Sequence, residues 1–326
     1  MDFINLILTP FRYLMSWLLW LFHEGFSLIG LDPNSGWTWT LSIIFVTIGV
    51  RAALIPLFAR QIRAQRAMQA LQPELRKLQA KYKGKKDQVS QQAMLAEQRA
   101  LFKSHNTGMF SSCLPLLVQM PFFFSLYTVL STTSKASGSN EGIAALSAAH
   151  VRSFDESKIF GAKLSDTFVG TLGSGNPNMA VIVVAIVMII AMVASQFFTQ
   201  RQLMTKNMTK EALEGPFMRQ QKMMMYILPL VFGIGGINFP IGLLIYWTAS
   251  NLWTLGQQMW VIKYNPTPGS LAEKELNIRR AAKGLPPVGK TRAQAEAEAA
   301  EAAEKAQAQQ QQQQRQQPQR KNRRKK

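Results

Sequence analysis

The sequence predicts an all-α polytopic membrane protein with five transmembrane helices. Of the 326 residues, 47% are hydrophobic and only 17% are charged, and the charges gather in blocks between long uncharged runs. Several of those runs have about the 20 residues that an α-helix needs to cross some 30 Å of hydrocarbon. Counting five crossings puts every basic block on one side of the membrane, as the positive-inside rule requires. The N-terminus is then outside and the C-terminus is cytoplasmic.

This prediction divides the chain into ten consecutive segments. They are an N-terminal interfacial segment and connector (1–37), a first transmembrane helix (38–59), a cytoplasmic helical hairpin (60–107), a second transmembrane helix (108–131), an extracytoplasmic loop (132–178), a third transmembrane helix (179–199), a cytoplasmic loop (200–222), a fourth (223–239) and a fifth (240–262) transmembrane helix, and a basic, disordered cytoplasmic tail (263–326).

The apolar run 3–22 is predicted to be a helix lying along the outer surface of the membrane. Pro10 and Arg12 interrupt it, and Trp17 and Trp20 are side chains that favour the headgroup level. A sixth span is the alternative. The run does not resemble a signal peptide, because it lacks a basic leader and a small-residue cleavage site.

The first predicted span contains a single charge, Arg51. At the middle of a helix, an arginine costs about 2.5 to 3.5 kcal/mol on insertion, against about 0.3 to 0.6 kcal/mol gained for each strongly apolar residue. The segment can therefore insert, but the guanidinium must face protein, water or a bound polar group. The alternative is that an intramembrane acid neutralises Arg51 or that its side chain snorkels to an interface. The other long apolar runs contain no Asp or Glu, so they offer no permanent partner within the membrane. This favours a functional role for Arg51.

The segment 60–107 is predicted to be a cytoplasmic hairpin of two helices. It carries eleven Lys or Arg residues against three acids, and it favours helix except around Pro73 and Gly84. Apolar residues recur at helical spacing on both arms. The arms are expected either to pack on each other or to lie against the membrane surface or a partner.

The later spans are marked by breaks and by charge. The second carries Gln119 between Pro115 and Pro121, which bend a helix and free backbone carbonyls. The loop 132–178 has four basic and four acidic residues, as expected outside. The apolar stretch 223–262 breaks at 238–242, which predicts two spans joined by a tight outer turn.

The tail ends in a basic cluster that is a candidate contact for RNA, and so for ribosomes, or for anionic lipid. A solubilising tail or topology anchor is the alternative. Its composition cannot form a core. The candidate residues are Arg315, Arg320, Lys321, Arg323, Arg324, Lys325 and Lys326.

Enzymatic chemistry is not expected. The sequence shows no nucleophile paired with a base, no carboxylate pair within a span and no phosphate-binding loop, and no cofactor is predicted. His23, His105 and His150 lie far apart in the sequence, which predicts no metal site. With Cys113 as the only cysteine, no intramolecular disulfide can form.

A small set of polar residues is predicted to lie at membrane depth. Thr47 and Arg51 are four residues apart and share one helix face. If the spans bundle with such faces inward, they form a wet, positively charged recess. Gln119, Ser250 and Asn251 could equally be helix-packing residues. The predicted substrate-binding residues are Arg51, Thr47, Gln119, Gln196, Tyr246 and Trp247.

Four stretches of the chain resemble the YidC insertases, relatives of the mitochondrial Oxa and chloroplast Albino proteins. They are Thr47-Ile-Gly-Val-Arg51, Leu71-Gln72-Pro73, CLPLLVQMPF from Cys113, and FPIGLLIYWTASNLWTLGQQ from Phe239 to Gln258. The resemblance covers about residues 3–262. The large periplasmic domain and additional first span of Gram-negative members are missing, so the chain resembles a Gram-positive, actinobacterial form. Thr107 replaces a usual proline, and Ser111-Ser112 replace a glycine pair.

The resemblance implies a membrane protein insertase and chaperone. Its five-helix core encloses a hydrophilic groove that is open to the cytoplasm and lipid but closed outside. Arg51 would receive the polar or acidic flank of an incoming membrane protein, with Thr47 and Trp247 along its path. A hairpin glutamate of the family corresponds to Glu97 and is expected to approach Arg51.

The implied partners are nascent membrane proteins, the Sec translocon (SecYEG, SecDF), membrane lipids, and the ribosome through the basic tail. The chain is expected to be a monomer in the bacterial plasma membrane. The alternative function is a small anion transporter or channel that uses Arg51. A transporter should show internal repeats, and none is visible.

Overall fold

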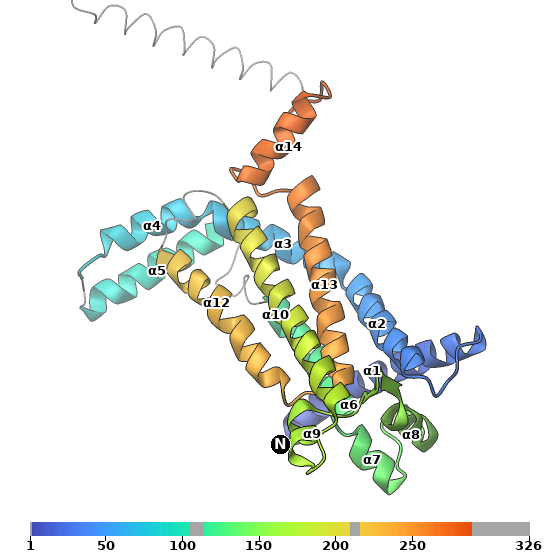
Figure 1. Ribbon diagram of the computed structural model, residues 1–326. Helices are drawn as coiled ribbons and strands as arrows, with labels where there is room; N and C mark the ends of the chain where they lie inside the picture. Colours follow the sequence, from blue (N-terminus) through green and yellow to red (C-terminus); the bar gives the residue numbers. More distant parts are fainter. Residues whose placement is uncertain (1, 86, 105–113, 209–215, 289–326) are drawn as a thin grey trace, which may run out of the picture.

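The computed structural model describes residues 2–85, 87–104, 114–208 and 216–288, which are mostly helical (Figure 1). The elements are α1 (Asp2–Leu28), α2 (Gly36–Ala53), α3 (Ile55–Ala70), α4 (Gln72–Lys81), α5 (Gln88–Ser104), α6 (Leu114–Ser131), α7 (Thr133–Ser139), α8 (Ala148–Glu156), β1 (Lys158–Ile159), β2 (Ala162–Lys163), α9 (Phe168–Gly173), α10 (Met179–Asn207), α12 (Pro216–Gly236), α13 (Ile241–Tyr264) and α14 (Leu271–Ala281).

The centre of the molecule is a bundle in which α13 packs between α2 and α10, and α12 packs on the other side of α10. Figure 1 shows α2, α10, α12 and α13 running side by side along the bundle. The helix α6 contacts α13, α3 and α1. Fully buried Ile43, Val46, Leu126, Val181 and Leu243 bring four of these helices into one hydrophobic core.

The helix α1 lies across one end of this bundle (Figure 1) and packs on α2 and α6. It is longer than the predicted 3–22 segment. Met15 and Leu19 are fully buried against the bundle, whereas Tyr13, Trp17 and Leu21 are exposed on the opposite side. This division between a buried and an exposed apolar face suits a helix at a membrane surface. Its interfacial position stays a prediction.

Residues 132–178, which we call the cap, fold into helices and a small β-hairpin at the same end of the bundle. β1 and β2 are antiparallel, with Lys158 opposite Lys163. The cap holds the start of α13, because Gly242 N–H donates to Leu164 O at 2.8 Å. It also contacts the first turn of α2, where a Cβ on Gly36 would lie only 2.1 Å from Lys158 O. Only glycine fits there. The sequence predicted a polar loop here and did not anticipate this packing.

The first predicted span, 38–59, is interrupted in the structure at Leu54, between α2 and α3. Pro56 explains the break, because proline has no N–H for the helical ladder and restricts the residue before it. The helices α3, α4 and α5 then form the hairpin. Buried Met68, Leu71 and Leu75 pack with Phe102 from the other arm. The two arms therefore pack on each other, which was one of the two predicted arrangements.

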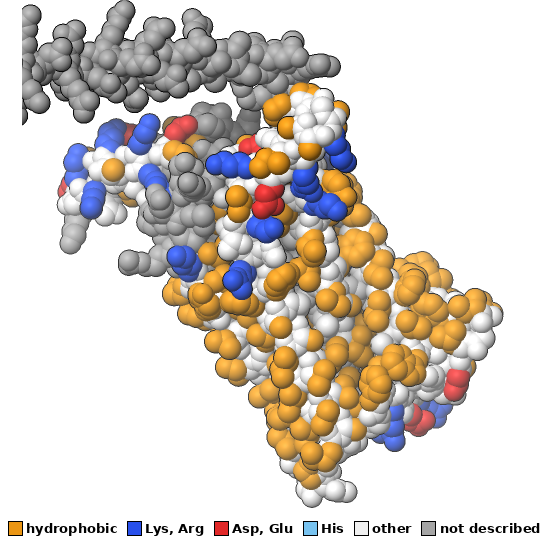
Figure 2. Space-filling model, turned by 45° about the horizontal axis from the view of Figure 1, so that its top comes forward, with side chains coloured by type: hydrophobic (Ala, Val, Ile, Leu, Met, Phe, Trp, Pro, Cys, Tyr) orange, Lys and Arg blue, Asp and Glu red, His pale blue; other side chains and the backbone are white. Residues whose placement is uncertain are grey.

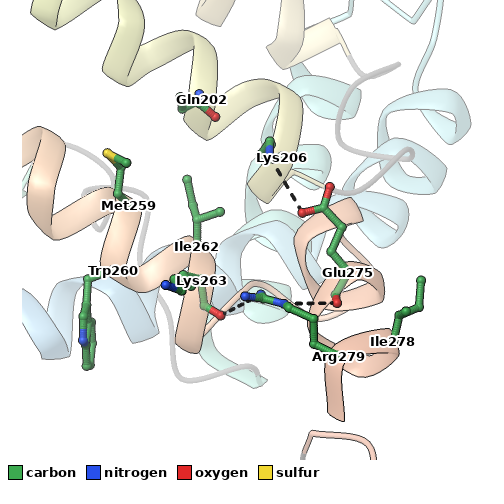
Figure 3. A pocket seen from close by; sticks show the side chains of 9 residues that line it. All are labelled: Gln202, Lys206, Met259, Trp260, Ile262, Lys263, Glu275, Ile278 and Arg279. Atoms are coloured by element: carbon green, nitrogen blue, oxygen red, sulfur yellow. Dashed lines mark hydrogen bonds and ion pairs between the residues drawn. The ribbon is translucent and has the colours of Figure 1, made fainter. Parts of the chain in front are cut away.

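The helix α14 was not anticipated, since residues 263–326 were predicted to be disordered. Ser270 caps its N-terminus by accepting from Glu273 N–H, and the helix packs on α10 and α13. A pocket of about 640 Å³ lies between these three helices (Figure 3). In it Lys206 pairs with Glu275 at 3.7 Å, and Arg279 Nη2 donates to Lys263 O at 3.1 Å. None of the predicted site residues lines this pocket.

Within the described residues, two helices, α2 (Gly36–Ala53) and α10 (Met179–Asn207), are long and apolar enough to cross a membrane by length and composition alone, and Met225–Gly236 is a shorter apolar stretch. Five spans were expected. Polar residues such as Asn251 and Gln257 lower the mean hydropathy of α13. The other two expected spans, α6 and α12, adjoin residues outside the described ranges.

The long sides of the bundle are nonetheless covered with apolar side chains. Figure 2 shows hydrophobic side chains over most of the visible face of the bundle, and charged side chains toward its ends. The exposed apolar residues of α2, α6, α10, α12 and α13 include Phe45, Ile48, Leu117, Phe124, Val183, Val187, Ile190, Leu230, Ile234 and Leu252. Soluble monomers rarely expose such continuous apolar surface, which is the expected exterior of a protein surrounded by lipid.

Candidate functional site

Arg51 lies in the last turn of α2 and is partly buried. Its Nη2 donates to Ser250 Oγ on α13 at 2.5 Å, and its guanidinium lies 5.5 Å from the centroid of the Phe58 ring. Its buried Nε atom has no hydrogen-bond partner in the part of the chain that the structure describes. Among the residues that the structure describes, no carboxylate pairs with Arg51. The charge is thus held by a neutral hydroxyl and an aromatic face, which leaves it able to attract an anion.

A second hydrogen bond continues the polar contact from α13 to α6. Gln119 Nε2 donates to the hydroxyl of buried Tyr246 at 2.7 Å. Tyr246 and Ser250 are four residues apart on α13 and so lie on one helix face. Arg51, Ser250, Tyr246 and Gln119 therefore connect α2, α13 and α6, and we call these four residues the polar cluster.

Several buried polar atoms around these helices have no partner among the described residues. They include Arg51 Nε, Gln119 Oε1, Gln196 Oε1, Thr248 Oγ1, Trp253 Nε1 and both amide atoms of Gln61. A buried polar atom left unpaired costs about 1 to 3 kcal/mol, and natural proteins satisfy nearly all such atoms with protein or water. Their number here favours a hydrated interior over a dry one.

Gln61 is a residue that sequence reasoning missed. Its side chain is only 2% exposed on α3. Gln61 lies in the basic hairpin segment, where a glutamine is expected to face solvent. The apolar periodicity of the segment therefore gives no sign that this side chain is buried. Only the packing of α3 against its neighbouring helices in the folded chain reveals it.

The remaining predicted substrate-binding residues have other surroundings. Thr47 is buried, and its hydroxyl donates to Ile43 O of its own helix at 2.8 Å. Trp247 lies in an aromatic group, with ring centroids 4.8 Å from both Phe123 and Phe232. Gln196 on α10 makes no hydrogen bond to the polar cluster, whose four residues the structure describes, and its buried Oε1 is unpaired there. Near it, Asn251 Nδ2 donates to Met192 O at 3.3 Å and ties α13 to α10, which is the packing role that was the alternative for Asn251.

Glu97 was expected to approach Arg51, but the structure gives it other partners. Its Oε1 accepts hydrogen bonds from Lys81 Nζ at 2.6 Å and from the Tyr82 hydroxyl at 2.8 Å. The bond from Lys81, followed by that from Tyr82, holds the pKa of the Glu97 carboxyl below its ordinary value. Glu97 thus joins α5 to the end of α4 across the hairpin. The tail candidates, Arg315 to Lys326, lie outside the described residues.

The fold and this site define a class: a helical, polytopic membrane protein with a partly buried cation in its polar cluster. Residues 30–268 match the family described as "60Kd inner membrane protein". The chain is 43% identical to a protein of Streptomyces avermitilis over 91% of this chain and 67% of the relative. It is 38% identical to one of Tropheryma whipplei, strain Twist, over 90% of this chain and 97% of the relative. A Bifidobacterium longum protein is 34% identical over 91% of this chain and 90% of the relative.

Each of these relatives is named membrane protein insertase YidC. The chain belongs to the YidC family of membrane protein insertases. This confirms the resemblance drawn from the four sequence stretches, and the actinobacterial relatives, which also include Mycobacterium proteins, agree with the predicted form. The expectation that the chain is not an enzyme agrees with this membership.

Proposed function

We propose that this chain inserts and folds integral membrane proteins in the bacterial plasma membrane through a hydrophilic groove around the polar cluster, alone or together with the Sec translocon. The observation that carries the proposal is Arg51, a cation inside a membrane bundle that is hydrogen-bonded to Ser250 and has an unpartnered Nε. Five helices, α2, α6, α10, α12 and α13, would enclose the groove. The apolar exterior and the charged ends of the bundle support this arrangement.

The mechanism follows from the cost of dehydration. A nascent span must carry its short polar flank across an apolar barrier, and each polar group loses its water on the way. A wet recess that reaches partway into the bilayer shortens the dehydrated path. Arg51 attracts an acidic flank strongly there, because water screens the charge less than in bulk. Burial of the cargo's apolar helix in lipid then drives its release, and no nucleotide is needed.

The predicted substrate-binding residues take separate parts in this mechanism. Arg51 would meet the polar flank, and the free acceptor oxygen of Gln119 and that of Gln196 would bind its donors. Tyr246 would hold Gln119 in place. Trp247 and Thr47 would shape the wall. Nascent membrane proteins are the proposed substrates, while Sec binding, ribosome docking by the tail, contact of the tail with lipid and the monomeric state stay predictions.

Hydration of the groove predicts different thiol reactivity at two positions of α6. In a Cys113→Ser background, Gln119→Cys should react with a membrane-impermeant maleimide at least about tenfold faster than Leu117→Cys, because only a hydrated thiol forms the reactive thiolate. Leu117 is 54% exposed on the apolar exterior and serves as the matched control. The labelling rate of each variant is measured in intact and in inside-out vesicles, so that both sides of the membrane are sampled. Equal rates would contradict a hydrated groove.

Reconstitution tests the function itself. The purified chain in liposomes should insert a short single-span protein whose acidic flank becomes protected from external protease, without nucleotide or Sec proteins. The same liposomes, loaded with chloride, test the rival anion transporter. Chloride efflux above that of empty liposomes, together with no protected flank, would favour the rival and reject the insertase.

A further inference from the structure

Three potential metal ligands meet where α1 contacts the cap. His23 and Glu24 lie near the end of α1, and His150 lies in the first turn of α8. One ligand atom from each residue lies within 4.8 Å of the others. The prediction of no metal site rested on the wide spacing of the histidines in the sequence, and the fold removes that reason for His23 and His150.

The ring of His23 leaves a buried lone pair in this cluster. The side chain is 2% exposed. Its Nε2 lies 2.9 Å from Pro33 O, and because a carbonyl only accepts, Nε2 carries the hydrogen. The other nitrogen, Nδ1, is then an acceptor in the neutral ring. It has no hydrogen-bond partner and lies 3.7 Å from Glu24 Oε1, which is also an acceptor. An unpartnered acceptor nitrogen on one side and a carboxylate on the other are the ligand pair that a cation would bridge.

The geometry around both rings is that of metal-binding histidines. Such a histidine commonly uses its second nitrogen to bond a carbonyl or another outer group, which fixes the ring. Pro33 O does this for His23, and Trp39 stacks on that ring at 3.9 Å between centroids. The Ser147 hydroxyl oxygen, 2.6 Å from Nδ1, fixes the His150 ring in the same way. His150 Nε2 is thereby directed at Glu24 Oε1, 2.8 Å away.

We propose that His23 Nδ1, Glu24 and His150 Nε2 bind a divalent transition metal, with zinc the best match. Zinc takes imidazole and carboxylate ligands at about 2.0 to 2.2 Å, which in a tetrahedron separates neighbouring ligand atoms by about 3.3 Å. The separations of 2.8 and 3.7 Å to Glu24 Oε1 lie within about 0.5 Å of that value, and the two ring nitrogens lie no more than 4.8 Å apart. Two imidazoles disfavour magnesium and calcium, which prefer oxygen ligands. Water would complete the coordination beside Glu24, which is partly exposed.

A metal here would crosslink α1 to the cap, joining residues 126 positions apart in the sequence. It would fix the helix that crosses the end of the bundle onto α8. This role is structural and does not depend on insertase activity, so the two proposals can fail separately.

Zinc content of the full-length protein tests the site. The protein is purified in detergent with an affinity tag that contains no histidine, incubated with zinc and desalted. We expect about one zinc ion per chain for the wild type, and at least about tenfold less for Glu24→Gln and His150→Gln. The control is Glu156→Gln, which removes an exposed acid at the end of α8 outside the cluster and should keep the zinc.

Cobalt and thermal unfolding give a second measurement that needs no variant. Co²⁺ added to the wild type should produce the visible absorption of a tetrahedral site, and zinc, but not magnesium, should abolish it and raise the unfolding temperature. If a variant does not fold, the cobalt titration of the wild type alone tests whether the site binds metal. No cobalt spectrum in the wild type, or equal zinc in the wild type and a folded His150→Gln, would overturn the proposal and leave a proton as the bridging cation.

Discussion

Replacing Arg51 with alanine is expected to reduce insertion of a protein with an acidic translocated flank by at least about tenfold. Two unit charges about 4 Å apart attract by some 4 kcal/mol at an effective dielectric constant of about 20, and each 1.4 kcal/mol corresponds to a factor of ten. The full attraction is an upper bound, because a flexible flank samples many distances. Alanine removes the charge and also leaves Ser250 Oγ without its donor. The measurement is the fraction of protease-protected flank in liposomes.

Two variants and a second substrate separate charge from general damage. Arg51→Lys keeps the charge and should retain part of the activity, although it loses the planar donor group. Arg60→Ala removes an exposed cation of α3 just after the span and should insert as the wild type does. A substrate with a neutral flank should depend less on Arg51. Equal loss for both flanks would contradict an electrostatic role and indicate a packing defect instead.

Arg51 was predictable because a charge in a membrane-length apolar run is costly, and that cost is visible from composition alone. Its partner Ser250 was not, since it lies 199 residues further along the chain and a serine in a span is common in helix packing. Tyr246 and Gln119 were both candidates, but only the docking of α6 on α13 shows that they bond each other. Sequence patterns identify which residues are anomalous, whereas contacts between helices determine which of them meet.

The folded cap and the helix α14 were not predicted from the sequence, for a different physical reason. Their order depends on tertiary contacts rather than on strong periodicity. The fully buried Val151 and Phe154 stand in a segment whose balanced charges indicated a solvated loop. Likewise, Ala272 is the one residue of α14 that the structure buries, too few to predict a packed helix. The hairpin, with apolar residues repeated on both arms, was the easier case.

The largest effect on stability is expected at Trp39. This side chain is fully buried where α1, α2 and the cap meet. It stacks on His23, lies 5.3 Å from the centroid of the Phe154 ring, and donates from Nε1 to Ser153 Oγ at 3.1 Å. Trp39→Ala should lower the free energy of unfolding by about 3 to 5 kcal/mol, the usual cost of removing a large buried aromatic side chain. Unfolding in mixed detergent micelles measures it.

Trp37→Ala is the matched control, because Trp37 lies on the same helix, is 52% exposed, and contacts the exposed Phe160. Its effect on the free energy of unfolding should be much smaller.

Trp39 and Arg51 are twelve residues apart, or about 18 Å along α2. Their effects on the free energy of unfolding should therefore add when the variants Trp39→Ala and Arg51→Lys are combined. Protease cleavage within residues 132–178 should also accelerate in Trp39→Ala, because the cap loses the contacts that Ser153 and Phe154 make with Trp39 on α2. Equal unfolding energies for the two tryptophan variants would show that the cap does not depend on this contact.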